Sequence, residues 1–323
     1  MTKRVLVTGG AGFIGSHLTR RLLDDGFAVR VVDNLSTGFR HNLEELSGRI
    51  DFIEGDICEP DVCAEAAADV EVIFHVAALP SVPRSMADPL GTHDANVNGT
   101  LHLLEAARRA GVRRFVYSSS SSAYGDTPAL PKVESMEPLP RSPYAAAKLS
   151  GELYALAYAR AGLLEAVALR YFNVFGPRQD PNGPYAAIVP LLFRAVLTET
   201  PVTIYGDGLQ TRDFTYVENV IDANVLGASQ PAGRASGHVV NVGTGSRITL
   251  LDLVSLAEEV SGRSIKVRHL PARAGDVRDS QAGLDRARSV LGYEPRVGLR
   301  EGMQRLWLWC SANPSTVIAV SRG

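Results

Sequence analysis

The sequence predicts an α/β fold in which a doubly wound parallel sheet is combined with a smaller, interleaved lobe. Three observations support this class. Apolar, β-branched runs alternate with helix-forming segments through the first half of the chain, as in sheets built by right-handed crossovers. Glycines follow the first of these runs at the spacing of a strand-to-helix turn. Beyond about residue 171 the alternation gives way to glycine- and proline-rich segments.

The composition is that of a globular chain with small-molecule partners. Its 323 residues are 45% hydrophobic, enough for one large domain or two joined ones. A formal net charge of −2 without a cluster of Lys and Arg argues against nucleic acid or an anionic membrane as a partner. No apolar run reaches the roughly 18 residues of a membrane span, and the first residues lead directly into a strand. We therefore expect a cytoplasmic protein without a signal peptide.

The first strand and its turn indicate a dinucleotide site. A strand predicted over residues 3–8 leads into Gly9, Gly12 and Gly15, and a helix is predicted over residues 13–25. Gly9 allows the tight turn, and Gly12 lets the backbone approach a pyrophosphate. Gly15 lets the helix lie close to the sheet, so that the pyrophosphate rests on the helix N-terminus.

The second strand supports the same interpretation. It is predicted over residues 28–32 and ends in Asp33, about 20 residues beyond the glycines, where a ribose-binding carboxylate is expected. A bare turn can produce the same glycine spacing. The surrounding strand, helix and carboxylate favour dinucleotide binding.

Polar and small residues follow the later strands, which are predicted over residues 50–53, 72–76, 114–118 and 165–170. Asp56 follows the third strand, Ala77 and Ala78 follow the fourth, and a serine run over residues 118–122 follows the fifth. The carboxyl ends of parallel strands meet at one edge, so these residues should face the same ligand. By their residue types alone, Asp56 is as compatible with an ordinary turn, and the alanines are as compatible with core packing, as they are with a ligand site.

Residues that can bind metals are interpreted as packing residues here. Cys58, Cys63 and Cys310 form no C-x-x-C pair and have no histidine at ligand spacing. His75 lies within a predicted strand, where a hydrogen-bonded core histidine is the favoured interpretation. We therefore predict no metal site and no disulfide.

The helix predicted over residues 144–161 carries a candidate general base. Ser142 and Pro143 provide an N-cap and a first-turn proline, and Gly162 ends the helix. Tyr144 and Lys148 are four residues apart, so a fixed ammonium lies beside a phenol and favours its phenolate. The serine run supplies a hydroxyl that could relay a proton. On its own, such a pair is usually only a helix surface.

The predicted domains interleave. Residues 1–172 form the dinucleotide-binding domain, and roughly 216–242 add a further helix and strand to it. Residues 173–215 and 243–323 form the second lobe. The tail from residue 311 has no clear pattern and is expected to be loosely ordered.

Taken together, these motifs resemble the extended short-chain dehydrogenases/reductases, and within them the UDP-hexose 4-epimerases. The resemblance extends to about residue 309. Its segments are residues 8–15, 33–34, 55–57, 75–78, 96–99, the serine run with Tyr124 and Gly125, 144–148, 170–173, Gly206 with 211–214, and 273–276. The set is specific, although each member alone is not.

The resemblance implies a Rossmann-like fold, bound NAD and a UDP-sugar substrate. Its catalytic residues are Ser120, Tyr144 and Lys148, with Ser121 or Ser122 as alternatives to Ser120. Asp33 takes the adenosine ribose hydroxyls and selects NAD over NADP. The implied cofactor-binding residues are Gly9, Gly12, Phe13, Ile14, Asp33, Asn34, Asp56, Ile57, Ala77, Ala78, Leu79, Asn96, Ser118, Tyr144, Lys148 and Phe172.

The implied substrate-binding residues are Ser120, Asn173, Arg212, Arg273, Asp276 and Ser280. Arg212 and Arg273 are candidates for the sugar-nucleotide pyrophosphate because a guanidinium matches phosphate oxygens in charge and geometry. Asp276 would orient Arg273 or a ribose hydroxyl. A small residue at Ser280, with the segment 178–187, resembles epimerases that accept N-acetylhexosamines.

The implied reaction is reversible C4 epimerisation of a UDP-hexose through a 4-keto sugar. Three alternatives remain: epimerisation of a UDP-uronic acid, a nucleotide-sugar dehydratase or decarboxylase, and a non-catalytic NAD-binding regulator. A homodimer is expected, because helices over residues 97–110 and 144–161 pair across a two-fold axis in this family. Gly151 is unfavourable within a helix, which suggests close packing there.

Overall fold

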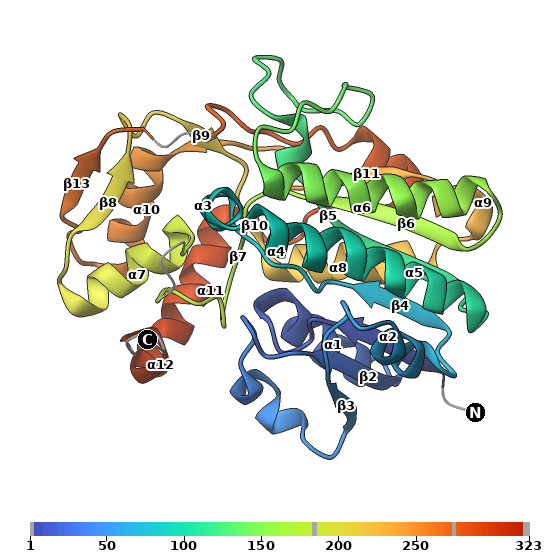
Figure 1. Cartoon of the computed structure of the whole chain (residues 1–323). Coiled ribbons are helices and arrows are strands. Elements are labelled where there is room, and N and C mark those ends of the chain that lie inside the picture. The colour runs from blue at the N-terminus through green and yellow to red at the C-terminus, as the bar shows by residue number, and fades with distance from the viewer. Residues whose placement is uncertain (1–2, 183–185, 273–275, 319–323) are drawn as a thin grey trace.

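The computed structural model describes residues 3–182, 186–272 and 276–318. Seven parallel strands form its central sheet, in the order β11-β6-β5-β4-β1-β2-β3 (Figure 1). Strand order reverses between β1 and β4, because β2 and β3 extend the sheet to one side and the later strands extend it to the other. The predicted class, an α/β fold with a doubly wound parallel sheet, is confirmed.

The predicted strands are all present, with ends shifted by one or two residues. The strands of the central sheet are β1 (Arg4–Thr8), β2 (Ala28–Asp33), β3 (Ile50–Glu54), β4 (Val72–His75), β5 (Arg114–Ser120), β6 (Glu165–Tyr171) and β11 (Val239–Val242). The first three serines of the serine run belong to β5. Their side chains therefore alternate between the two faces of the sheet.

Helices cover both faces of this sheet. One face carries α1 (Phe13–Asp24) and α8 (Val217–Ser229), and the other carries α2 (Pro60–Ala67), α5 (Gly99–Arg109) and α6 (Pro143–Arg160). Shorter helical turns are η1 (Arg40–Leu46), α3 (Val82–Ala87), α4 (Pro89–His93), η2 (Asp94–Asn98), η3 (Ser121–Tyr124), α9 (Ala232–Ala235) and η4 (Ala287–Leu291). No helix of the described chain is both long and apolar enough to cross a membrane.

The apolar core is split into two layers by the alternation of each strand. In β1, Val5 and Val7 face the layer under α1 and α8, whereas Leu6 faces the layer under α2, α5 and α6. Such strands are buried on both sides, which explains why they are apolar nearly throughout.

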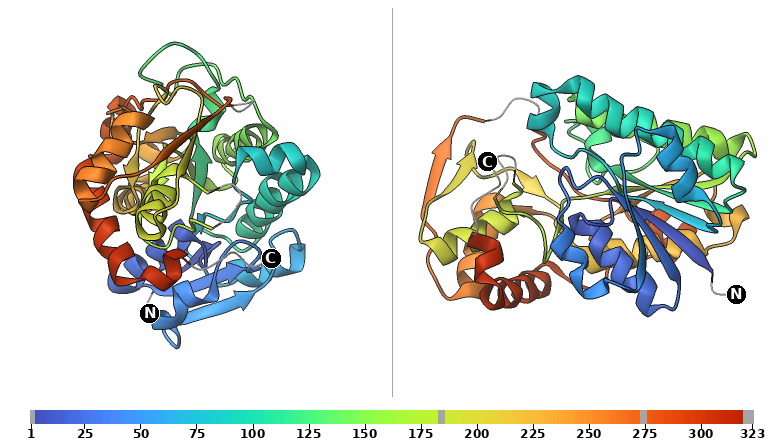
Figure 2. Two further views of the ribbon diagram at one scale, coloured as in Figure 1. Left: turned by 90° about the vertical axis from the view of Figure 1, so that its left-hand side faces the viewer. Right: turned by 60° about the horizontal axis from the view of Figure 1, so that its bottom comes forward.

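A second lobe lies beside the carboxyl edge of the sheet (Figures 1 and 2). Its helices are α7 (Ile188–Thr198), α10 (Leu250–Ser261), α11 (Leu299–Ala312) and α12 (Pro314–Ile318). Its short strands pair as β7 (Val174–Phe175) with β10 (Thr215–Tyr216), β8 (Val202–Tyr205) with β13 (Val267–Leu270), and β9 (Thr211–Arg212) with β12 (Ile248–Thr249). The division into 1–172 with 216–242, and 173–215 with 243–323, stays a prediction.

Two expectations about local packing need correction. Residues 311–312 end α11 and residues 314–318 form α12, so this part of the tail is not loosely ordered, and Val317 is buried. Residues 319–323 lie outside the described residues. Gly151 does pack closely, but its neighbour is Tyr117 of the same chain: a Cβ at Gly151 would overlap the Tyr117 hydroxyl. That hydroxyl donates to the backbone oxygen of Lys148 at 3.1 Å. Gly151 therefore offers no support for a dimer.

We predict that Gly151→Ala destabilises the protein. Alanine gains about 1 kcal/mol in helix propensity, but its methyl group displaces the Tyr117 ring, an overpacking cost of about 1–3 kcal/mol in addition to the bond to Lys148. Gly233→Ala in α9 is the matched control, because open space surrounds that position, and it should leave stability equal or higher. Urea unfolding measures both, and a stabilised Gly151→Ala variant would contradict the packing described here.

Candidate active site

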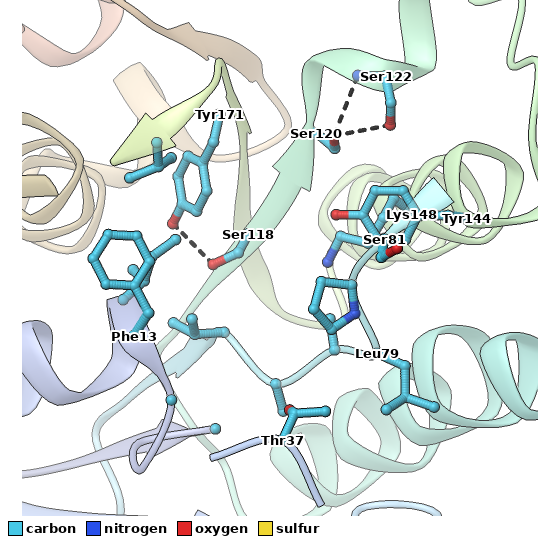
Figure 3. Close-up of a pocket in the computed structure, with 18 of the residues that line it drawn as sticks. Phe13, Thr37, Leu79, Ser81, Ser118, Ser120, Ser122, Tyr144, Lys148 and Tyr171 are labelled. Carbon is cyan, nitrogen blue, oxygen red and sulfur yellow. Dashed lines mark hydrogen bonds between the residues drawn. The ribbon is translucent and has the colours of Figure 1, made fainter. Parts of the chain in front are cut away.

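A cavity of about 640 Å³ opens at the carboxyl edge of the central sheet, between the sheet and the second lobe. Every described residue of the predicted site lines this cavity except Asn96. Arg273 lies outside the described residues. Figure 3 shows Phe13, Leu79, Ser118, Ser120, Tyr144 and Lys148 converging on it from α1, the β4 end, β5 and α6.

The glycine turn forms a cradle for an anion. Gly9 adopts φ +67°, and a Cβ there would lie 2.7 Å from the Cα of Ala77. A Cβ at Gly15 would overlap the backbone oxygen of Gly9. Helix α1 starts after Gly12 without a side-chain cap, so its first-turn N–H groups are open to a ligand. This end of the helix lines the cavity, where the helix dipole favours negative charge.

Two carboxylates, Asp33 and Asp56, line the cavity beside the glycine turn. Asp33 accepts the backbone N–H of Ala11 at 2.9 Å with one oxygen and that of Leu35 at 2.8 Å with the other. Burial raises the pKa of this carboxyl group, and the two N–H donors oppose the rise. Each oxygen keeps a lone pair for a ligand hydroxyl. Asp56 accepts from the Asn34 amide at 2.8 Å, which fixes both side chains at the cavity edge.

Asn96 differs from the prediction. It is buried behind the cavity wall, where its amide accepts from the backbone N–H of Leu79 at 2.8 Å and donates to the Leu79 oxygen at 3.1 Å. Both bonds tie the amide to Leu79, and the side chain is only 1% exposed. The structure makes Asn96 a support for Leu79, which does line the cavity.

His75 is a hydrogen-bonded core residue, as predicted. The Thr100 hydroxyl donates to a backbone oxygen, so it accepts from His75 Nε2 at 2.9 Å. The Thr8 hydroxyl accepts from the Ala77 N–H and therefore donates to His75 Nδ1 at 2.7 Å. Burial lowers the pKa of His75 to about 3, which keeps the ring neutral.

Tyr144 and Lys148 occupy successive turns of α6, which begins at a cap where Ser142 accepts from the N–H of Ala145 at 3.2 Å. Four residues apart on one helix, the two side chains share a face of α6, and both line the cavity. Lys148 is buried, with its Nζ 4.5 Å from the centre of the Tyr117 ring. Burial lowers the pKa of Lys148 to about 7, opposed by the charge of Glu152. Burial also raises the pKa of Tyr144, opposed by a hydrogen bond with Ser120.

The serine run divides its bonds among different partners. Ser118 shares a hydrogen bond with Tyr171 at 2.8 Å, and Ser119 donates to Glu152 at 2.6 Å. Ser120 accepts from the N–H of Ser122 at 3.2 Å and from its hydroxyl at 2.8 Å (Figure 3). With two acceptor positions filled, the Ser120 hydroxyl is left to donate toward Tyr144.

The second lobe brings a guanidinium to the cavity. Arg212 donates to the backbone oxygens of Thr211 at 2.9 Å and Arg278 at 3.1 Å. Burial lowers its pKa, opposed by the charge of Asp276 and more distant carboxylates. The next residue, Asp213, is fully buried and accepts from Thr244, Gly245 and Ala282. This network fixes the strand that carries Arg212.

Asn173 and Ser280 complete the described substrate residues. Asn173 is exposed at the cavity surface. Ser280 is buried, and its backbone N–H donates to the oxygen of Thr211 at 3.1 Å. Ser280 therefore contributes only a short side chain to the part of the cavity wall that the second lobe forms.

The sequence motifs missed several basic residues of the cavity. Lys132 is buried and donates to Thr127, and Arg141 and Arg178 also line the wall. Arg178 adopts a positive φ of 66°, which is uncommon for a residue with a Cβ. Isolated basic residues in loops form no periodic pattern. The glycines and prolines around Arg178 were the one available signal.

The assembled site can carry out a proton transfer next to a bound dinucleotide. A hydroxyl, a phenol and a lysine side chain line the cavity together with the glycine turn and the first turn of α1. Arg212 adds a guanidinium to the cavity lining from the second lobe. A substrate with a phosphate group and a sugar-like hydroxyl matches this distribution of groups.

Comparison with known proteins gives a consistent result. Residues 5–243 match the model of the NAD dependent epimerase/dehydratase family. The chain is 44% identical over 306 residues to the UDP-glucose 4-epimerase of Mycolicibacterium smegmatis, covering 94% of this chain and 96% of that protein.

Two solved structures resemble the fold over its whole length. One is UDP-glucose 4-epimerase with UDP-glucose from Thermotoga maritima, at 38% identity and a TM-score of 0.91, covering 96% of this chain and 99% of that one. The other is UDP-N-acetylglucosamine 4-epimerase from Methanobrevibacter ruminantium in complex with UDP-N-acetylmuramic acid. Its identity is 38% and its TM-score 0.90, over 97% of this chain and 99% of that one.

Proposed function

Because the chain belongs to the NAD dependent epimerase/dehydratase family, we propose that it acts as an NAD-dependent 4-epimerase of UDP-hexoses, with UDP-glucose and UDP-galactose as substrates. The observation that carries this proposal is the convergence of Ser120, Tyr144 and Lys148 at one end of a dinucleotide cavity. Relatives of this activity align over almost the entire chain.

The residues present fit NAD. The glycine turn leaves no room for side chains, and the uncapped first turn of α1 presents N–H groups to a pyrophosphate. Asp33 keeps a lone pair on each oxygen for the adenosine ribose hydroxyls, and Lys148 would hold the nicotinamide ribose. When bound, NAD would supply the hydride acceptor and donor that reversible oxidation at the sugar C4 requires.

Tyr144 serves as the base that takes the proton from the C4 hydroxyl and later returns it. Ser120 donates a hydrogen bond toward the same oxygen, which places the substrate hydroxyl between the two side chains. A charged Lys148 favours the phenolate of Tyr144. Arg212, together with Arg273, retains the substrate through its phosphates while the 4-keto sugar turns over. Inversion needs this division between a tightly held diphosphate and a loosely held sugar.

The neighbouring serines favour epimerisation over dehydration. A dehydratase needs an added acid–base pair beside its active hydroxyl, whereas Ser121 and Ser122 provide no carboxylate. Ser122 is instead used to orient Ser120. A non-catalytic regulator is disfavoured, since such proteins commonly lack the tyrosine or the lysine, and both line the cavity here.

We predict that purified protein carries NAD and interconverts UDP-glucose and UDP-galactose, as product analysis with a panel of UDP-sugars would show.

Tyr144→Phe should remove nearly all turnover while NAD stays bound, because one phenolic oxygen adds little to packing. Ser120→Ala should lower kcat by roughly 10²–10⁴-fold, as for other positioned proton-transfer groups. Ser121→Ala is the matched control. A larger loss in that control would place the catalytic hydroxyl one residue later.

A homodimer in the cytoplasm is part of this proposal. On α6, Leu153 is 54% and Tyr154 41% exposed, and Leu90 on α4, which packs against α6, is 77% exposed. An exposed apolar surface of this kind is typical of a protein interface. Light scattering should give twice the 34.6 kDa chain mass. Leu153→Glu should shift the protein toward monomer, and a monomeric wild type at micromolar concentration would refute the dimer.

The substrate range includes the N-acetyl sugars. Ser280 leaves space in the cavity wall, and a relative of known structure is a UDP-N-acetylglucosamine 4-epimerase. We predict that Ser280→Tyr suppresses turnover of UDP-N-acetylglucosamine by roughly 10- to 100-fold, since an acetamido group against the ring costs about 1–3 kcal/mol. Turnover of UDP-glucose should change little, with Ser280→Ala as the control. Equal losses on both substrates would place the determinant of specificity elsewhere.

A further inference from the structure

A buried ion pair lies directly behind the catalytic residues. Arg170 on β6 donates to Glu152 on α6 through Nε at 2.9 Å and Nη2 at 2.6 Å. Both side chains are almost inaccessible, at 3% and 2% exposure. Ser119 adds a third donor to the same carboxylate at 2.6 Å. A pair this deeply buried is costly to desolvate and often gives no net stability, so its presence calls for another explanation.

The carboxylate of Glu152 connects the two elements that carry the catalytic groups. Ser119 directly precedes Ser120 on β5, and its register partner across the sheet is Arg170. Glu152 follows Lys148 by one turn of α6, so the two side chains share a helix face. One carboxylate therefore fixes α6 against the end of β5.

Among the groups around Lys148, Glu152 is the one whose charge favours the protonated side chain. The surrounding groups are the Tyr117 ring below it, neutral His75 from β4, and Tyr144 on its own helix. Glu152 is the anion that favours the ammonium form. Arg170 stays charged at every accessible pH: burial lowers its guanidinium pKa, but Glu152 and other partners outweigh this and raise that pKa above its ordinary value. If Glu152 lost its charge, Lys148 would deprotonate more readily, whereas Arg170 would stay charged. Tyr144 would then lose the positive charge on its own helix that favours its phenolate.

Building on the proposed function, we propose that Glu152 is a positioning residue that keeps the Lys148 ammonium charged beside Tyr144 and so sets the alkaline limit of the enzyme's working pH range. Glu152 touches neither substrate nor cofactor in this role. It acts on the reaction through Lys148 and through the Ser119 bond that orders the end of β5.

The test is the pH profile of kcat for the NAD-bound enzyme with Glu152→Gln. The amide keeps the shape but removes the charge, so the pKa of Lys148 falls, and the ammonium is lost at lower pH. We expect the alkaline limb of kcat to move down by about one pH unit, equivalent to about tenfold at a fixed pH on that limb. The loss should shrink as pH falls, and KM should change little. The absorbance of the Tyr144 phenolate is identified as the tyrosinate signal that is missing in Tyr144→Phe. In Glu152→Gln this signal should appear at a higher pH than in the wild type.

A matched pair provides the control. Arg114 on β5 and Glu165 on β6 form another Arg–Glu ion pair, with bonds of 3.0 and 2.8 Å. It lies at the first residues of these strands, whereas Arg170 and Ser119 lie near their ends. Glu165→Gln should lower stability and leave the pH profile unchanged. Glu152→Asp, which retains the charge, should keep the wild-type alkaline limb even if the protein is less stable.

Glu152→Gln leaves the buried charge of Arg170 without a counterion, so this variant could fail to fold. A double variant avoids this problem. Glu152→Gln with Arg170→Gln replaces the ion pair by two amides and should shift the limb in the same direction by a smaller amount. An unchanged limb and an unchanged tyrosinate titration in the folded variants would overturn the role of Glu152. Wild-type protein without C4 inversion would instead refute the proposed function, and the tyrosinate titration would still report on Glu152.

Discussion

The close approach of three backbone segments at Gly9 is the constraint on which the rest of this structure depends. The end of β1, the end of β4 and the start of α1 meet there, and a Cβ at Gly9 would lie 2.7 Å from the Cα of Ala77. This contact occurs where the strand order of the sheet reverses, so the strands diverge on either side and leave a crevice above their carboxyl ends. The cradle for the dinucleotide is therefore the outcome of packing in the sheet. His75 on β4 bonds to Thr8 at the end of β1 and to Thr100 of α5, and Asn96 of η2 holds Leu79 beyond the end of β4.

The chemistry depends on charges placed in a region of low polarity. Burial opposes ionisation of both Tyr144 and Lys148, so neither has its ordinary pKa. Local partners oppose this effect: Ser120 through a hydrogen bond to the phenol, and Glu152 through its charge on the ammonium. Because these interactions are only weakly screened inside the protein, small displacements of α6 against β5 change the balance. The Glu152–Arg170 pair and the packing of Gly151 on Tyr117 both restrict such movement.

The second lobe contributes in a different way. It presents Arg212 and Ser280 on adjoining segments that are held together by buried Asp213, whose carboxylate accepts four hydrogen bonds from around residues 244 and 282. In the proposed reaction the phosphates of the substrate stay in place, and a rigid arrangement of this kind suits such a contact. At Tyr144 the cavity presents the hydroxyl of Ser120, and in the proposed reaction the sugar lies there and turns over. This contrast between the lobes agrees with a reaction in which one part of the substrate stays fixed and another turns.

The sequence by itself determined the fold class, the strands and the groups of the cavity that follow a local rule. Gly9, Gly12 and Gly15 mark a turn, Asp33 follows the second strand, and Tyr144 and Lys148 share a helix face; each pattern depends on neighbours in the chain. Only the tertiary structure decided the contacts between distant segments. It placed Asn96 behind the wall rather than on it, gave Gly151 a partner in Tyr117, and joined Glu152 to Arg170 and Ser119. These pairings come from elements far apart in sequence whose packing no local periodicity encodes, so they appear only once the sheet has brought the elements together.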